Sequence, residues 1–412
     1  MKRTLAFGGL VATAGLLASG LATPAQAAGD VASAPLSATQ IAAKNVASFW
    51  VAEKAANLIQ ATPYSVETTV PAKHVSTGGP SADSKPGVVP AIGDEKKSTA
   101  KSKNVNLPKT TGKVFFVGGD GKPHWCTATS VQANYRNLVA TAGHCVYDTE
   151  SNKATLDRWV FVPGYYQAKT PWGIYVGKQA FTHYDYDVYE DADRDYAFVT
   201  VYNGLQFPAG GFADFKGMTK EQRQAYAGFK VVDKATYDAY VAAGAKDNNR
   251  FGYYEDKDDK GNPVYYVWKF TDAGRLGDNV GGQGLAYNQK LGSKPVFVFG
   301  YPSGSHPDGN YAFSGKTLKW SYGKPFAATA PSIKGEELQG VKSSFTGEGS
   351  LGSAWLIGYN NSRRLGYLNG VTIAVADRDG NKRIDTSLSP YFDGETYGVY
   401  SAAKNVWSGS IA

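Results

Sequence analysis

The sequence predicts an all-β protein, built as a barrel or a sandwich. Aromatic residues make up 13% of its 412 residues and charged residues 19%, with 27 Tyr and 48 Gly, which is typical of a folded, turn-rich chain. From position 113 onward, short β-branched and aromatic runs alternate with Gly, Pro, Asn and Asp, as strands alternate with turns. The runs lie at 114–117, 138–142, 159–162, 174–176, 197–201, 296–299, 317–321, 354–357 and 371–375. A helical bundle or a disordered chain would not combine these features.

The first 27 residues predict a secretory signal peptide. Lys2 and Arg3 precede an apolar stretch over 5–21, and Pro-Ala-Gln-Ala at 24–27 supplies the small residues of a cleavage site. No later stretch reaches about 18 consecutive apolar residues, so no membrane anchor is expected in the mature form. We therefore expect a secreted protein.

Residues 28–110 are interpreted as a pro-segment and linker, with a permanent N-terminal extension as the alternative. The run Ser-Ala-Thr-Gln at 37–40 has the spacing of a capping box, and the Ala-rich stretch over 41–60 behind it predicts a helix that ends before Pro63. Between 71 and 111 the chain is rich in Lys, Ser, Thr, Pro and Gly, a composition too polar to form a core.

The β-rich pattern defines one domain over 111–403, followed by a tail over 404–412. Residues 217–292 interrupt this pattern with helix-like runs at 220–227 and 234–243, and we interpret them as an insertion.

Charge and composition exclude several partner classes. The net charge of +7 is too small and too dispersed to indicate a nucleic-acid partner. The two cysteines, Cys126 and Cys145, predict a disulfide in an exported chain, with two free thiols as the alternative. No cofactor is expected.

No metal site is expected either. The Asp-rich run at 377–385 is similar to a calcium loop, but Lys382 and Leu388 occupy positions where such a loop needs Gly and Glu. A solvated hairpin is the simpler interpretation.

A specific motif ends the predicted strand over 138–142. The run Thr-Ala-Gly-His-Cys at 141–145 places His144 beside one of the two cysteines. With these residues the chain resembles the chymotrypsin-fold serine peptidases, particularly the secreted bacterial trypsin-like and glutamyl-endopeptidase-like branch, over about 113–403. The resemblance implies a chymotrypsin-like double six-stranded β-barrel, a cleft between the barrels, and hydrolysis of peptide bonds with His144 as the general base.

The resemblance also implies which carboxylate orients His144. The run Asp-Arg-Asp-Tyr-Ala-Phe-Val at 193–199 looks like the family's Asp-x-Ala strand and assigns this role to Asp195, with Asp193 as the competitor. The chain order of His, Asp and then nucleophile is that of chymotrypsin, whereas an α/β-hydrolase runs Ser, Asp or Glu, His.

The nucleophile loop departs from the family pattern. The family reads Gly-x-Ser-Gly-Gly-Pro or Gly-x-Ser-Gly-Ser-Pro, and this chain reads Gly-Glu-Gly-Ser-Leu-Gly-Ser-Ala-Trp over 347–355. Counting back from Trp355 places Leu351 at the nucleophile position, whereas counting forward from Gly347 places Ser350 there. The two counts differ by one residue.

The oxyanion hole favours the count that selects Leu351. It needs a backbone N–H two residues before the nucleophile, in a conformation that Gly adopts easily. That residue is Gly349 for Leu351 and Glu348 for Ser350. Leucine cannot attack a carbonyl, and loss of a triad nucleophile costs about six orders of magnitude in turnover.

Two hypotheses about function follow. In the first, the protein is a serine endopeptidase that uses His144, Asp195 and Ser350. In the second, it is an inactive pseudoprotease whose cleft binds an extracellular peptide or protein. A glycan-binding β-protein is a third alternative that rests only on aromatic content. The resemblance further implies that the strand Leu368–Asn369–Gly370 pairs with the backbone of the bound peptide.

Overall fold

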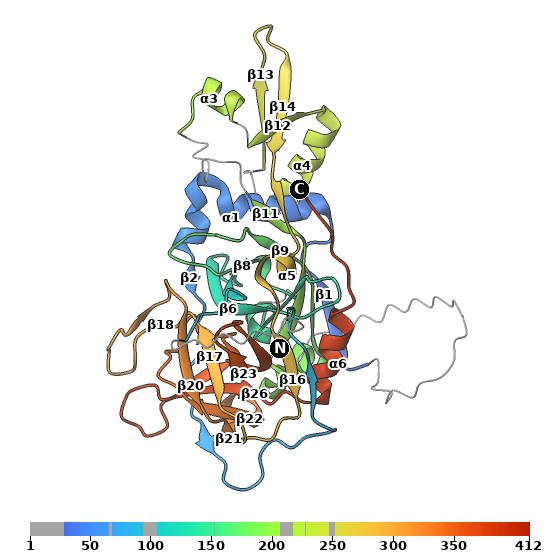
Figure 1. Ribbon diagram of the computed structural model, residues 1–412. Helices are drawn as coiled ribbons and strands as arrows, with labels where there is room; N and C mark the ends of the chain where they lie inside the picture. Colours follow the sequence, from blue (N-terminus) through green and yellow to red (C-terminus); the bar gives the residue numbers. More distant parts are fainter. Residues whose placement is uncertain are drawn as a thin grey trace, which may run out of the picture.

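The computed structural model describes residues 29–65, 68–93, 105–151, 153–206, 217–226, 228–246 and 252–412. The predicted signal peptide over 1–27 lies outside these ranges. Figure 1 shows two β-rich halves side by side, with residues of the predicted insertion projecting from one end. The predicted all-β class is confirmed.

The first half is a closed barrel of six strands. Its order is β9-β10-β7-β6-β5-β8, and β8 also pairs with β9 to close the ring. The strands are β5 (Thr111–Val117), β6 (Pro123–Val131), β7 (Leu138–Thr141), β8 (Asp157–Pro163), β9 (Tyr175–His183) and β10 (Ala197–Val201). Every residue of β5, β7 and β10 is buried, which explains why these strands form continuous apolar runs in the sequence.

Short helical turns link these strands where the site lies. The 3₁₀ turn η1 (Gly143–Cys145) follows β7. The helix α2 (Tyr184–Tyr189) and the 3₁₀ turn η2 (Ala192–Arg194) connect β9 to β10.

The second half is an open barrel of two sheets. One sheet has the order β20-β17-β23-β24-β16-β4 and the other β25-β26-β22-β21-β3. Their barrel strands are β16 (Gly284–Tyr287), β17 (Val296–Gly300), β20 (Lys319–Gly323), β21 (Phe326–Ala330), β22 (Gly335–Lys342), β23 (Ala354–Asn360), β24 (Leu365–Val371), β25 (Ala374–Ala376) and β26 (Thr386–Pro390). The 3₁₀ turn η3 (Pro331–Ile333) joins β21 to β22, and β18 (Ser303–Gly304) pairs with β19 (Phe313–Ser314). The chymotrypsin-like double barrel is therefore confirmed, with the second barrel open rather than closed.

The N-terminal region adds strands to both halves. Its elements are β1 (Val31–Pro35), β2 (Thr62–Pro63), β3 (Lys73–His74) and β4 (Gly87–Val89). β1 pairs with β9 and β2 with β6 in the first barrel, while β3 pairs with β21 and β4 with β16 in the second. The described part of the predicted pro-segment and linker thus belongs to the sheets of the domain. Its removal by processing stays a prediction.

The helix predicted over 41–60 is α1 (Gln40–Gln60). Its N-cap is Thr39 rather than Ser37, because the Thr39 hydroxyl accepts a hydrogen bond from the N–H of Ala42 at 3.2 Å. The helix shares a hydrophobic cluster with the first barrel, in which the Trp50 ring lies 5.7 Å from that of Phe115.

The insertion forms a small sheet with flanking helices. Its elements are the sheet of β12 (Phe229–Val232), β14 (Pro263–Trp268) and β13 (Tyr253–Lys257), the strand β15 (Thr271–Gly274), and the helices α3 (Lys220–Ala225), α4 (Lys234–Lys246) and α5 (Leu276–Val280). β15 pairs with β11 (Gly204–Gln206), which precedes the predicted insertion. Both predicted helices are present. Gly284–Tyr287, at the end of the predicted insertion, pairs with the second barrel as β16.

A helix that the sequence analysis did not expect, α6 (Gly394–Ala403), packs against β9 and β10. Asp393 caps it by accepting a hydrogen bond from the N–H of Thr396 at 3.0 Å. Among the described residues, no helix combines the length and apolar character needed to cross a bilayer.

Candidate active-site cleft

Local packing holds His144 at the end of β7. The disulfide between Cys126 and Cys145 joins β6 to η1, as the sequence predicted, and closes a loop whose crosslink contributes about 3 kcal/mol in the chain-entropy model. Gly143 leaves room for a neighbouring aromatic ring, because a Cβ at this position would lie 2.5 Å from Tyr186. The imidazole is therefore carried by a crosslinked and closely packed turn.

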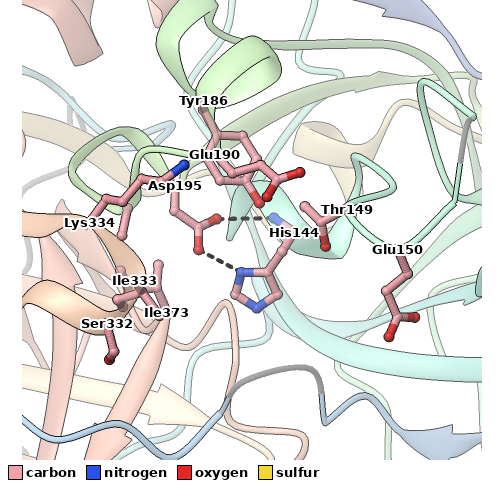
Figure 2. Close-up of a pocket in the computed structure, with 11 residues that line it drawn as sticks. His144, Thr149, Glu150, Tyr186, Glu190, Asp195, Ser332, Ile333, Lys334 and Ile373 are labelled. Carbon is pink, nitrogen blue, oxygen red and sulfur yellow. Dashed lines mark hydrogen bonds and ion pairs between the residues drawn. The ribbon is translucent and has the colours of Figure 1, made fainter. Parts of the chain in front are cut away.

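Asp195 holds His144 through two hydrogen bonds. His144 Nδ1 lies 2.6 Å from Asp195 Oδ2, and the backbone N–H of His144 donates to Asp195 Oδ1 at 3.0 Å (Figure 2). Both residues are buried, with 7% and 6% of their surface exposed. A proton on Nδ1 satisfies the carboxylate and leaves the lone pair on Nε2, which has no hydrogen-bond partner within the described part of the chain.

Asp193, the competitor of Asp195, faces a different partner. Its carboxylate accepts hydrogen bonds from the N–H groups of Glu336 and Glu337 at 3.0 and 2.8 Å. Burial raises the pKa of Asp193 to about 6, although these two N–H groups act in the opposite direction. Asp193 thus joins the two barrels instead of orienting the imidazole.

A cavity of about 510 Å³ lies beside the pair of His144 and Asp195. Residues of both barrels line it, and Figure 2 shows the charged side chains Glu150, Glu190 and Lys334 around the pair. The other lining residues are Thr149, Tyr186, Ala192, Ser332, Ile333 and Ile373. Burial and the Asp195 carboxylate raise the pKa of Tyr186, which therefore stays neutral at ordinary pH. The cavity has the position and the mixed polarity of a cleft that binds a ligand.

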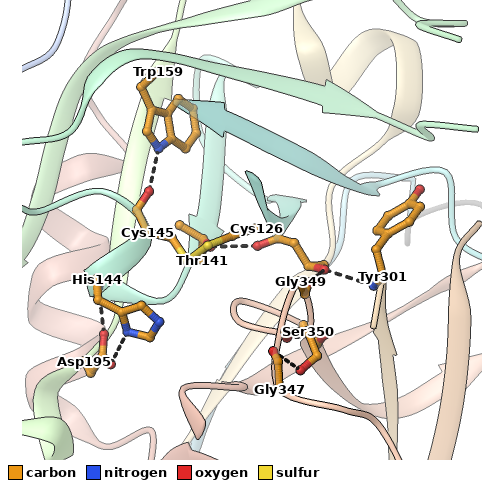
Figure 3. Close-up of a disulfide and its surroundings, with 12 residues drawn as sticks. Cys126, Thr141, His144, Cys145, Trp159, Asp195, Tyr301, Gly347, Gly349 and Ser350 are labelled. Carbon is orange, nitrogen blue, oxygen red and sulfur yellow. Dashed lines mark hydrogen bonds and ion pairs between the residues drawn. A yellow bond between two sulfur atoms is a disulfide. The ribbon is translucent and has the colours of Figure 1, made fainter. Parts of the chain in front are cut away.

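Ser350 turns toward its own loop. Its N–H and its hydroxyl both donate to the carbonyl of Gly347, at 3.1 and 2.9 Å. Its side chain is fully buried and does not line the cavity. Figure 3 shows the Ser350 hydroxyl directed at Gly347 and not at the imidazole of His144. In this geometry Ser350 offers neither an aligned hydroxyl nor a free N–H for an oxyanion.

Two glycines determine the shape of the nucleophile loop. Gly349 has φ of +73° and Gly352 has φ of +78°, a backbone region that disfavours other residues. A Cβ would lie 2.3 Å from the Trp125 ring at the first position and 2.0 Å from the Thr127 carbonyl at the second. This spacing of glycines matches the count that places Leu351 at the nucleophile position.

Leu351 lies between these glycines, fully buried in the core cluster that the two barrels share. Its carbonyl accepts a hydrogen bond from the N–H of Thr127 at 2.8 Å, which ties the loop to the first barrel next to the disulfide. The loop therefore keeps a fixed backbone without a reactive side chain at that position.

The strand predicted to pair with the substrate has no free edge at its centre, so that prediction needs correction. Leu368 in β24 stands opposite Leu356 on one side and Leu285 on the other. The carbonyl of Asn369 accepts from Gln339 Nε2 at 2.7 Å, and Gly370 pairs with Trp355. At Leu368 both edges of β24 are occupied, so a peptide cannot add to the sheet at this residue, whereas Gly370 has a strand partner on one side only and pairing there stays a prediction.

The edge that reaches the cleft comes later in the same chain, at β25. Ile373, which precedes β25, lines the cavity. β25 pairs with β26 on one side, and on its other side Val375 pairs with residues 68–70 of the N-terminal region rather than with a barrel strand. Sequence reasoning missed this edge, because the apolar run over 371–375 was interpreted as one uninterrupted strand. It also missed Tyr186 and Glu150, which carry no motif.

A cluster of carboxylates outside the cleft lies in the hairpin after β25. Oxygens of Asp377, Asp379 and Asp385 lie within 4.8 Å of one another. Asp377 already accepts hydrogen bonds from the N–H groups of Gly380 and Lys382, at 3.0 and 2.8 Å. Such bonds are those of an ordinary Asx-type turn.

No protein-family model and no curated protein matches this chain. It is similar to the solved structure of the protease Anisep from Arthrobacter nicotinovorans, with 22% identity, a TM-score of 0.47, and coverage of 73% of this chain and 98% of that one. A thermostable serine protease, AL20, from an extremophilic microorganism has 19% identity and a TM-score of 0.45, with the same coverage. A Glu endopeptidase has 15% identity and a TM-score of 0.42, over 74% of this chain and 96% of that one.

Proposed function

We propose that this protein is a secreted, chymotrypsin-fold protease homologue that binds peptide in its cleft without cleaving it. The observation that carries the proposal is the nucleophile loop, in which Leu351 stands between the two glycines and Ser350 bonds to Gly347. A site with His and Asp in position but no attacking group can recognise a peptide, yet it cannot form an acyl-enzyme.

The pair of His144 and Asp195 would then act as a recognition group. A proton on Nδ1, held by the buried carboxylate, leaves a lone pair on Nε2. That atom is itself buried, so it would meet an N–H or O–H group of a ligand only when the side chains around it move. Because the imidazole is 7% exposed, such a hydrogen bond would form in a partly dehydrated site, where leaving Nε2 unpaired is costly. The ligand we expect is a peptide or an extended protein segment.

Peptide hydrolysis by Ser350 is the second candidate, supported by the free Nε2 of His144. It would require both the hydroxyl and the N–H of Ser350 to leave the carbonyl of Gly347. The hydroxyl would then have to come within about 3 Å of Nε2.

The test compares turnover and binding in one protein. We would add a library of fluorescence-quenched peptides to the full chain and measure cleavage, and follow the imidazole ¹⁵N resonances of His144 with intact peptides. We expect no cleavage above the level of the Ser350→Ala variant, and a shift of the His144 resonances by peptides that mass spectrometry shows to be uncut.

The His144→Ala variant identifies the resonances and serves as the binding control. Cleavage by the natural chain that disappears in Ser350→Ala would contradict the proposal and establish the second candidate. Failure of every peptide to shift the resonances, in the natural chain and also in a Val70→Pro chain whose N-terminal segment is opened, would exclude peptide recognition by this pair.

A further inference from the structure

An N-terminal segment passes beside His144 and pairs with β25, next to the 510 Å³ cavity but outside its lining. We call it the strap and define it as residues 62–65 together with residues 68–75. It begins at the end of α1 and continues to β3.

The first part of the strap covers one side of the imidazole. Thr62 and Pro63 pair with β6, and the N–H of Tyr64 donates to the carbonyl of Trp125 at 2.9 Å. The Tyr64 ring stacks near His144, with 6.4 Å between ring centroids and 28° between planes, and Tyr64 is only 3% exposed. Burial and the carboxylates of Glu150 and Asp148 raise the pKa of Tyr64, so its hydroxyl stays protonated.

The second part of the strap pairs with the β25 edge. The N–H of Val70 donates to the carbonyl of Val375 at 3.0 Å, and the N–H of Val375 donates to the carbonyl of Thr68 at 2.8 Å. These bonds flank a parallel bridge between Thr69 and Val375. Thr68 and Val70 are buried whereas Thr69 between them is exposed, which is the alternation of an added strand.

The strap also touches the nucleophile loop. A Cβ at Gly347 would lie 2.7 Å from the Cβ of Thr68, so the loop accommodates the strap only because glycine stands there. Past this contact, β3 pairs with β21, and the N–H of Val75 donates to the carbonyl of Ala327 at 2.9 Å. The strap is therefore held by backbone pairing on both sides of the cleft.

We propose that the strap is an intramolecular ligand of the cleft, and that an outside peptide binds along β25 only when the strap leaves. This inference rests on the proposed function for the identity of the competitor, an extended peptide segment. The peptide that we expect has uncharged side chains at two positions two residues apart, which correspond to Thr68 and Val70. Its backbone would form the two hydrogen bonds that Val375 makes with the strap.

Covalent attachment makes the strap a strong competitor. A tethered segment acts at an effective concentration in the millimolar range, so a free peptide of equal intrinsic affinity must exceed that concentration to displace it. Opening the strap should therefore tighten the binding of an added peptide without any new contact.

A matched pair of proline variants tests this inference. Val70→Pro removes the N–H that bonds to Val375, whereas Thr69→Pro places proline at the bridged residue, whose own N–H points away from Val375. The probe is a fluorescent peptide with the sequence of residues 62–75, and a scrambled peptide serves as its control. Hydrogen exchange of the Val375 amide is measured in the same samples.

We expect Val70→Pro to bind the probe at least about tenfold more tightly than the natural chain, and its Val375 amide to exchange at least about tenfold faster. Thr69→Pro should stay close to the natural chain in both measurements. A second pair removes any dependence on proline: Tyr64→Ala opens the space beside His144, and Tyr64→Phe keeps the ring.

Each outcome separates the strap from the proposed function. Faster exchange of Val375 without probe binding would support the strap and contradict peptide recognition by the cleft. Equal probe binding by the natural chain, Val70→Pro and Tyr64→Ala, with unchanged exchange at Val375, would overturn the strap and leave peptide recognition intact.

Discussion

The two sides of the proposed cleft differ in which parts of a serine-peptidase site they contain. On the first barrel, His144 and Asp195 keep both the geometry and the chemical groups of an acid–base pair. On the second barrel, the loop around Leu351 keeps two left-handed glycines and a fixed backbone but carries no aligned nucleophile. The shape of this loop is thus maintained by backbone sterics and packing, which do not depend on a reactive side chain.

The largest expected effect comes from placing a serine hydroxyl at position 351 on the second side of the cleft. We predict that Leu351→Ser, introduced together with Val70→Pro to open the cleft, reacts with a serine-directed phosphonate at least about a thousandfold faster than Val70→Pro alone. Intact-mass spectrometry follows the adduct. His144→Ala in the same background should abolish the gain.

Because Leu351 is fully buried, Leu351→Ser also costs roughly 2 to 4 kcal/mol of stability, and folding is verified first by circular dichroism. A folded Leu351→Ser variant that is no more reactive than its parent would show that position 351 is not the nucleophile position.

The next effect concerns the crosslink on the first side. The double variant Cys126→Ala and Cys145→Ala should lose about 3 kcal/mol of unfolding free energy, because the unfolded chain regains the entropy of the closed loop. Urea unfolding measures this loss, and reduction of the natural chain should reproduce it. A loss below about 1 kcal/mol would mean that Trp159, whose Nε1 donates to the carbonyl of Cys145 at 3.0 Å, holds the turn rather than the disulfide.

The glycines of the second side predict an effect of similar size, with an internal control. Gly352→Ala should destabilise the fold by about 3 kcal/mol, from backbone strain together with a Cβ that meets the Thr127 carbonyl at 2.0 Å. Gly121→Ala shares the positive φ, at +76°, but its Cβ meets nothing within 4 Å, so about 1 kcal/mol is expected. Equal losses in urea unfolding would show that only φ matters at position 352.

The smallest effect is the pH dependence of the contact between the barrels. Burial raises the pKa of Asp193 to about 6, above its ordinary value of 3.8, so the folded state holds this proton more tightly than the unfolded state. Its contribution to stability is full below about pH 4 and is lost as the pH rises through 6. The urea midpoint of the natural chain should therefore fall more between pH 4 and 6 than that of Asp193→Asn, and an identical decline in both would contradict this assignment.

The first side of the cleft could be predicted from sequence because its signals are local. His144 stands beside a cysteine at the end of an apolar strand, and Asp195 lies just before another apolar strand. The residues next to them in the sequence are therefore also their neighbours in the fold. The all-β class and the disulfide followed from composition and cysteine count in the same way.

The rest of the cleft depends on pairing between distant segments, which no local pattern reveals. Val375 has a barrel strand on one side and the strap on the other, whereas Leu368 has a barrel strand on each side, and only the assembled sheet shows this difference. Tyr64 reaches His144 from just before the stretch over 71–111 that looked too polar to join a core. Backbone pairing with β6 and packing against Phe116 hold it there.

The central claim is that this cleft binds peptide without a working nucleophile, and covalent labelling of the opened protein tests it most directly. We would incubate the Val70→Pro chain with a series of serine-directed phosphonates and determine its intact mass. An unchanged mass with every phosphonate is the predicted result. A stoichiometric adduct on Ser350, lost in Ser350→Ala and in His144→Ala, would contradict the claim and identify an active peptidase.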